Sequence, residues 1–145
     1  MDRRDALRLL SVPAIAPLRA LEVARLTAAQ AARVPDVEFT LTAAPADVAL
    51  LPGPRTRVWQ YTARLVRGPA STVQSVADSY LGPILRLRRG QHVRVHFANR
   101  LDEPSIVHWH GLDVPEAADG HPRLAVDGGR DYVYDFEVVN RAGTY

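Results

Sequence analysis

The stretch QHVRVHF, residues 91–97, alternates polar and apolar side chains from His92 onward. Because successive side chains of a β-strand point to opposite faces, this alternation predicts a strand that is buried on one face and polar on the other. Further strand-like runs are found at residues 37–42, 57–61, 84–88, 106–110 and 132–139. Turn signals with glycine or proline separate the runs, for example at residues 52–54 and 127–129. A series of short strands joined in this way predicts an all-β sandwich or barrel.

The composition excludes several kinds of protein and site. The 145 residues are 47% hydrophobic, which suits one domain plus an extension at most. All 18 basic residues are arginines scattered along the chain, and the net charge is only +2, so we expect no nucleic-acid surface. No run of 18 apolar residues is present, so no membrane span is expected. The absence of cysteine excludes disulfides, zinc–thiolate and iron–sulfur sites, and any copper centre in this chain that needs a thiolate.

Residues 1–35 are expected to form an N-terminal extension to a domain at residues 36–145. Arg3 and Arg4 precede an uncharged stretch at residues 9–18, and this order resembles a twin-arginine export signal. A short alanine-rich helix or a disordered arm is the alternative. If the signal is real, the protein is periplasmic or secreted; otherwise it is cytoplasmic.

Two of the five histidines, His108 and His110, are two residues apart in the predicted strand at residues 106–110. On a strand their Cα atoms would be about 7 Å apart with both imidazoles on one face, while Trp109 would point into the other layer. Neutral imidazoles are common ligands of copper and zinc. A single metal needs three or four ligands, so the pair alone fits either a metal site or two surface or hydrogen-bonded histidines.

The other three histidines are expected to be bystanders. His92 and His96 share the polar face of residues 91–97 with Arg94, so they are predicted to face solvent and not to bind metal. His121 lies in an Asp-Gly-His-Pro turn, and the turn is a sufficient reason for its position.

Several segments, taken in order, resemble the first cupredoxin domain of the multicopper oxidases, the laccase-like blue copper enzymes. They are GPILRLRRGQHVRVHFANRL at residues 82–101, VHWHGL at 107–112, DGHP at 119–122, YDF at 134–136 and AGTY at 142–145. The most specific element is the His-Trp-His-Gly tetrapeptide that begins at His108. The resemblance implies an all-β, cupredoxin-like Greek-key β-sandwich with an N-terminal extension.

The resemblance also implies a copper function. In that family the two histidines of the tetrapeptide bind different metals of a trinuclear copper cluster, which reduces dioxygen to water with electrons from a reducing substrate. Carried over, His108 would bind the type 2 copper and His110 a type 3 copper. Asp119 would be a carboxylate bonded through water near the type 2 copper, where it supplies protons. The alternative for Asp119 is that it only shapes the Asp-Gly turn.

The sequence departs from the family pattern at its end. Residues 143–145 resemble the lead-in to the family's second ligand motif, Trp-Tyr-His-x-His, which does not follow. The later cupredoxin domains, which supply the other ligands, are also missing, so we expect an incomplete domain that is inactive as an oxidase on its own. Smaller departures at Gln91, Asp127 and the long segment 66–80 affect loops rather than ligands.

Two other functions stay open from the sequence. His108 and His110 followed by Glu116 loosely resemble the His-x-His and Glu order of a cupin, which holds one iron, manganese or zinc ion. The other is a non-catalytic cupredoxin-fold module with vestigial histidines. Added copper distinguishes these cases, because a ligand that binds only the folded state raises its stability.

Overall fold

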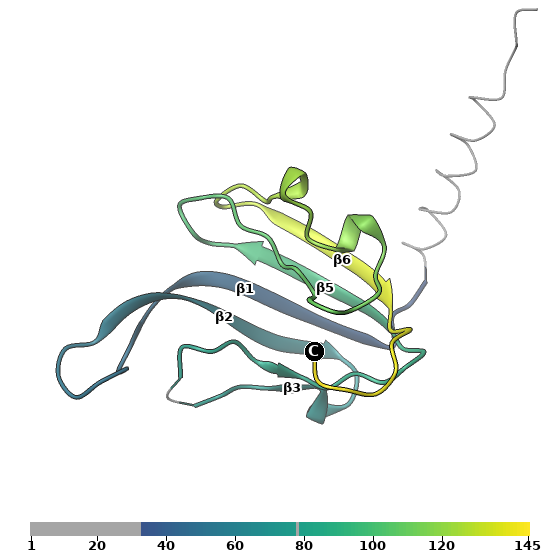
Figure 1. The fold of residues 1–145 in the computed structure, drawn as a ribbon, viewed down its shortest axis with the longest axis horizontal. Helices are drawn as coiled ribbons and strands as arrows, with labels where there is room; N and C mark the ends of the chain where they lie inside the picture. The colour runs from purple at the N-terminus through teal and green to yellow at the C-terminus, as the bar shows by residue number, and fades with distance from the viewer. Residues whose placement is uncertain (1–32, 78) are drawn as a thin grey trace, which may run out of the picture. The chain divides into compact units, whose positions relative to one another are not determined.

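The computed structural model describes residues 33–77 and 79–145. Its strands (Figure 1) and short 3-10 helices, marked η, are β1 (Val37–Val48), β2 (Thr56–Arg67), η1 (Ala70–Thr72), β3 (Val73–Gln74), β4 (Ile84–Leu85), β5 (His92–Asn99), η2 (Glu116–Ala118), η3 (Pro122–Leu124) and β6 (Asp131–Glu137). Within the described ranges, no helix is both long enough and apolar enough to cross a bilayer. The described chain is thus built from strands with only single turns of helix, and the prediction of an all-β fold is confirmed.

Four strands form the main sheet in the order β2-β1-β5-β6. Strand β1 runs antiparallel to β2 and parallel to β5, with Val37 opposite Val93, and β6 runs antiparallel to β5. Strands β3 and β4 form a separate two-stranded sheet. Because two parallel neighbours cannot be joined by a tight hairpin, the chain between β2 and β5 crosses over, and this crossover carries the second sheet.

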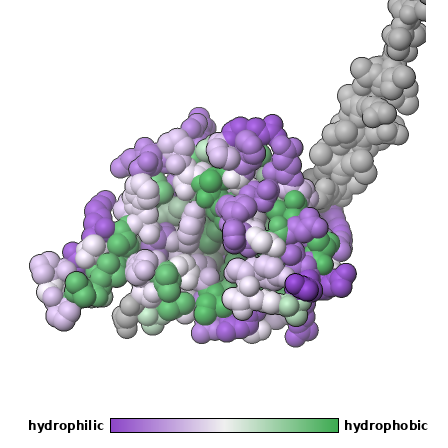
Figure 2. All heavy atoms as spheres, in the orientation of Figure 1, coloured by the Kyte–Doolittle hydropathy of each residue, from purple (hydrophilic) through white to green (hydrophobic). Residues whose placement is uncertain are grey.

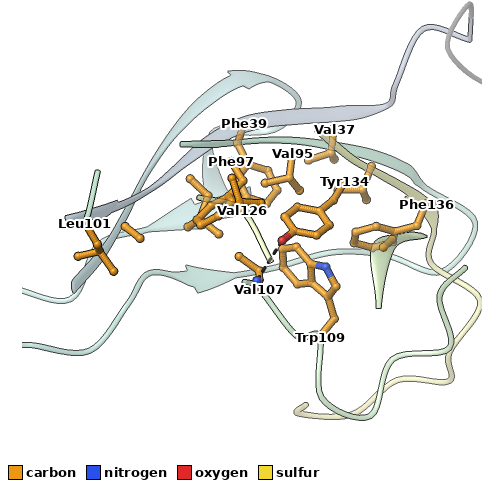
Figure 3. Close-up of a cluster of buried hydrophobic side chains, with 14 residues drawn as sticks. Val37, Phe39, Val95, Phe97, Leu101, Val107, Trp109, Val126, Tyr134 and Phe136 are labelled. Atoms are coloured by element: carbon orange, nitrogen blue, oxygen red, sulfur yellow. Dashed lines mark hydrogen bonds between the residues drawn. The ribbon is translucent and has the colours of Figure 1, made fainter. Parts of the chain in front are cut away.

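The core covers one face of the main sheet (Figure 3). Its strand residues occupy alternate positions, as the sequence pattern predicts: Val37, Phe39, Leu41 and Ala43 on β1, Val93, Val95 and Phe97 on β5, and Tyr134 and Phe136 on β6. Val107 and Trp109 close the core from the other side, with exposures of 8% and 9%. The apolar side chains of the strand predicted at residues 91–97 therefore face the core, as expected.

The strand predicted at residues 106–110 is not a strand. The segment is extended, and its nearest ladder contact is an isolated bridge between Ser105 and Val126. The alternation of side chains is nevertheless real, because Val107 and Trp109 are buried whereas His108 and His110 are exposed. The pattern of a sequence reports which way side chains face, and it does not report whether a neighbouring strand is present to pair with the backbone.

The prediction that His92 faces solvent is wrong. Its side chain is only 2% exposed, its Nε2 donates to Asp135 Oδ1 at 2.5 Å, and its backbone N–H donates to Asp36 Oδ2 at 2.8 Å. Arg94 Nε donates to the other oxygen of Asp135 at 2.7 Å. Asp135 of β6 thus bonds to both His92 and Arg94 and holds β5 against β6, so His92 has a structural role on the outer face of the sheet.

His96 lies further along the same face and is 43% exposed. Its Nε2 is 2.7 Å from Glu38 Oε1 on β1. It therefore links β5 to β1 as His92 links β5 to β6.

The hairpin of β1 and β2 extends past the core. At its far end Trp59 lies opposite Pro45, and Trp59 and Leu51 are 62% and 77% exposed. Figure 2, in the orientation of Figure 1, shows apolar residues along this end of the hairpin, at the left of the view. The sheet is thus longer than the core that it covers.

Candidate metal centre

The two histidines of the His-Trp-His-Gly element lie on an extended segment between β5 and β6, which we call the histidine segment (residues 105–111). Side chains of the main sheet hold its backbone. Tyr61 donates its hydroxyl hydrogen to the Ile106 carbonyl at 3.1 Å, and the Val107 N–H donates to the Tyr134 hydroxyl oxygen at 3.0 Å. Figure 3 shows the second of these bonds in the core. Two tyrosine hydroxyl groups thus bond to backbone groups that a neighbouring strand would otherwise pair with.

Trp109 determines which way the histidines face. Its ring lies in the core, with ring centroids 5.8 Å from Tyr134 and 5.3 Å from Phe136 (Figure 3). The prediction that Trp109 points into the core is confirmed. Because successive side chains of an extended segment alternate, a buried Trp109 places His108 and His110 together on the outer side.

The two imidazoles are close neighbours. Their ring centroids are 5.6 Å apart and the rings are inclined at 73°. His108 Nδ1 is 2.6 Å from the backbone carbonyl oxygen of Asp119. A carbonyl oxygen can only accept, so Nδ1 carries the hydrogen and the lone pair of His108 is on Nε2. The His108 ring is therefore fixed in direction and in tautomer, with the lone pair of Nε2 available to a ligand.

Asp119 reaches His108 in a way that the sequence did not reveal. The carboxylate oxygen Oδ1 is 3.5 Å from His108 Nδ1, too long for a good hydrogen bond, whereas the carbonyl oxygen of the same residue is at 2.6 Å. The Asp119 side chain is 50% exposed. The residue thus holds the histidine through its backbone and leaves its carboxylate next to the ring and open to water.

Gly120 permits this contact. Its φ of +77° is in the left-handed region, and a Cβ added there would be 2.4 Å from the Val107 carbonyl oxygen and 2.8 Å from the His108 Cα. The Asp119–Gly120 turn therefore packs directly against the backbone of the histidine segment. Tyr132 holds the preceding helix η2, because its hydroxyl donates to the Ala117 carbonyl at 2.8 Å. Only a glycine at position 120 allows the turn to approach the histidine segment so closely.

The structure brings together three of the residues predicted for the site, His108, His110 and Asp119, and leaves the others apart. The carboxylate of Glu116, which a cupin site would need, pairs with the Arg123 guanidinium. His121 is occupied in its turn, where Nδ1 accepts from the Arg123 N–H at 3.2 Å. Across residues 33–77 and 79–145, no group of three or more His, Asp or Glu side chains is arranged to hold one metal ion.

Four residues that support the site were missed by sequence reasoning: Tyr61, Gly120, Tyr134, and Asn140, whose side-chain amide bonds to the backbone of Gly111 and Asp113. Gly120 has a visible signal, because an Asp-Gly pair is typical of a tight turn. The tyrosines have only a partial one, since alternation predicts that they face inward but gives no partner for the hydroxyl group. Asn140 has none, since a lone asparagine after a strand is common in turns.

We expect replacement of Tyr134 by phenylalanine to change the pH dependence of stability. Burial raises the pKa of Tyr134 above its ordinary value of about 10, although the hydrogen bond from Val107 opposes the shift. The resulting stabilisation is complete below about pH 10 and is lost as the pH rises through the folded-state pKa. Tyr134→Phe should abolish that loss, and should cost about 1–3 kcal/mol at neutral pH because the buried Val107 N–H loses its acceptor.

Urea unfolding at several values between about pH 8 and about pH 11 measures both effects. Tyr80→Phe is the matched control, because the Tyr80 ring is 52% exposed and its loss of a hydroxyl should be nearly neutral. If the Tyr134→Phe variant lost stability with rising pH as steeply as the unaltered protein, the assignment to Tyr134 would be wrong.

Comparison with known proteins gives a consistent result. The sequence profile of the multicopper oxidase family matches residues 57–145. The chain is 41% identical over 83 residues to a copper resistance protein A homolog of Pseudomonas syringae pv. tomato, and 35% identical over 78 residues to the multicopper oxidase mco of Staphylococcus aureus. These matches cover 55% and 54% of this chain but only 14% and 17% of the relatives, so the chain spans a small part of their length.

A solved structure agrees with the sequence matches. The multicopper oxidase McoA from Aquifex aeolicus superposes with a TM-score of 0.60 at 32% identity, over 76% of this chain and 21% of that one. The predicted cupredoxin-like fold is thereby confirmed. This fold accounts for the strands of the described chain. The predicted export signal at Arg3 and Arg4 lies outside the described residues.

Proposed function

Because the chain belongs to the multicopper oxidase family, whose cofactor is copper, we propose that it supplies His108 and His110 as ligands to a trinuclear copper cluster that reduces dioxygen to water. His108 would bind the type 2 copper and His110 a type 3 copper. The observation that carries the proposal is the pair of outward-facing imidazoles with centroids 5.6 Å apart, one of them fixed by the Asp119 carbonyl.

The residues fit copper. Imidazole nitrogen is a favourable ligand for copper, and a hydrogen bond from the other ring nitrogen to a carbonyl is the usual way to orient such a ligand. His108 has this arrangement, with Nδ1 bonded and Nε2 available. Both rings are exposed, so a metal can reach them without a change in the fold.

The other cluster ligands are proposed to come from further cupredoxin domains. Two imidazoles are fewer than one copper needs, and the described part of the chain offers no third ligand beside them. The relatives are much longer than the part that this chain matches, which supports a cluster completed by additional polypeptide. On this proposal the chain alone binds copper weakly and does not turn over dioxygen.

Asp119 has a proposed role in proton supply. When bound, the copper cluster would pass electrons from a reducing substrate to dioxygen, and the reduced oxygen requires protons. The Asp119 carboxylate is half exposed and 3.5 Å from the His108 ring, so it can exchange protons with solvent and hold them beside the cluster. We also propose that a reducing substrate supplies the electrons, and that the protein is exported to the periplasm or secreted.

Titration with Cu(II) tests the ligand assignment. We expect His108→Ala and His110→Ala each to weaken Cu(II) binding by at least about 100-fold, since even residues that only orient a ligand are worth 10–100-fold. His121→Ala is the control, because that imidazole is exposed and belongs to a turn. Isothermal titration gives the affinities, and electron paramagnetic resonance reports the number of nitrogen ligands.

The same titration separates the alternatives. A cupin-like site would lose its metal in a Glu116→Ala variant, whereas the proposed site should be indifferent to that change. Equal Cu(II) affinity in the unaltered protein and in both His108→Ala and His110→Ala would refute the proposed function and leave the non-catalytic module.

A further inference from the structure

The turn that contains His110 is hydrogen-bonded by the side chain of a residue far away in the sequence. Asn140 follows β6, and its Nδ2 donates to the Gly111 carbonyl at 3.0 Å. The Asp113 N–H donates to Asn140 Oδ1 at 2.9 Å. One amide group therefore uses both its donor and its acceptor on two residues, Gly111 and Asp113, that lie just after His110 and are 29 and 27 positions from Asn140 in the sequence.

The backbone at His110 is a tight turn. The Leu112 N–H donates to the Trp109 carbonyl at 2.9 Å, which closes a β-turn with His110 and Gly111 in the middle. Gly111 has a φ of +80°, the value that the third residue of a type II turn requires. The direction of the His110 side chain is thus set by the orientation of this turn, and Asn140 bonds to the carbonyl of the third residue of the turn, Gly111.

The two histidines are held differently. His108 has its own ring bond, from Nδ1 to the Asp119 carbonyl. The His110 ring makes no hydrogen bond within the described part of the chain, and its ring contact is with the edge of His108. The direction of His110 therefore depends on its backbone, which is anchored by the buried Trp109 ring on one side and by Asn140 on the other.

We propose that Asn140 is a positioning residue that sets the direction of the His110 imidazole for copper. The inference rests on the proposed function, since it concerns the geometry of the same ligand pair. An amide side chain suits the role because it donates to one backbone group and accepts from another. Asn140 is only partly buried, so its replacement removes these two bonds without emptying a core position.

The test uses Asn140→Leu and Asn140→Ala in the full chain. Leucine has nearly the same shape as asparagine without its polar atoms, so an equal effect of both variants assigns the effect to the hydrogen bonds. Gln60→Ala is the matched control, since the Gln60 amide donates to the Ser79 carbonyl at 2.6 Å, outside the histidine segment. Imidazole NMR signals of the metal-free protein, thermal unfolding and Cu(II) titration are measured for each protein.

In both Asn140 variants we expect the His110 ring signals to shift and broaden, while those of His108, whose ring is held by the Asp119 carbonyl, change less and stay sharp. The Cu(II) affinity should fall by about 10–100-fold, with an altered paramagnetic resonance spectrum and retained cooperative unfolding. A merely structural role would lower the unfolding temperature and leave the His110 signals and the spectrum of bound Cu(II) unchanged. That result would overturn the inference while leaving the proposed function intact.

Failure of the proposed function has a different signature. If the unaltered protein bound Cu(II) independently of His108 and His110, the ligand assignment would fall and the positioning role with it. If Gln60→Ala weakened Cu(II) binding as much as Asn140→Ala, the effect would be a general loss of order and the inference would again be overturned.

Discussion

Gly120→Ala adds a single methyl group to the chain and is expected to disorganise the site strongly. The new Cβ would be 2.4 Å from the Val107 carbonyl oxygen and 2.8 Å from the His108 Cα, so the turn or the histidine segment has to move. The left-handed φ of +77° adds about 1–2 kcal/mol of backbone strain for a residue with a Cβ. Either movement breaks the bond between the Asp119 carbonyl and His108.

We expect this variant to lose about 2–4 kcal/mol of unfolding free energy and to bind Cu(II) at least about 10-fold more weakly. Denaturant unfolding and Cu(II) titration measure the two losses. Gly129→Ala is a close control, because Gly129 has a φ of +75° but nothing within 4 Å of an added Cβ. The control should show the strain alone. Equal behaviour of the two variants would mean that the contact with Val107 and His108 has no role in the site.

The second large effect is expected at Trp109. Its indole ring is 9% exposed and packs on Tyr134 and Phe136, so Trp109→Ala should cost about 3–5 kcal/mol of unfolding free energy. The same change also removes the ring that anchors the backbone between the two histidines to the core. Copper affinity should therefore fall together with stability, even when it is measured on the folded fraction of the protein.

Two further variants separate these effects. Phe39→Ala removes a fully buried ring from β1 and should lower stability by a similar 3–5 kcal/mol, roughly, while the folded protein keeps its copper affinity. Trp109→Phe should be much milder, because the indole Nε1 is buried with no hydrogen-bond partner in the described residues and phenylalanine lacks only that group and part of the ring. A Trp109→Ala protein that bound Cu(II) normally would show that the core does not orient the pair.

The sequence predicted which side chains face the core better than it predicted which residues they contact. Alternation over residues 91–97 correctly identified the buried side of β5, and the same reasoning placed Trp109 inward and the two histidines outward. It failed for the pairing of the histidine segment, because alternation is equally compatible with a strand and with an extended loop held by tyrosine hydroxyl groups.

Asp119 and His92 show two reasons why the sequence did not reveal the remaining contacts. The contact of Asp119 with His108 runs through a backbone carbonyl, which every residue type has, so no side-chain pattern can predict it. His92 lies on the polar side of β5, yet Asp36 and Asp135 cover it from segments 56 and 43 residues away. Burial on a polar face depends on such distant partners, and a local pattern contains no information about them.

The absence of a strand ladder along the histidine segment separates the proposed metal site from the architecture of the sheet. Within a paired strand, inserting one residue reverses the facing of every later side chain, and the hydrophobic set would leave the core. In residues 105–111 no ladder fixes such a register: beyond the isolated bridge at Ser105, the segment is fastened at single points by Tyr61, Tyr134 and Asn140 and by the buried Trp109 ring. A change on either side of Trp109 that keeps its ring in the core can therefore alter the directions of the imidazoles without moving a strand, which makes this loop the natural position for redesigning the proposed metal geometry of the domain.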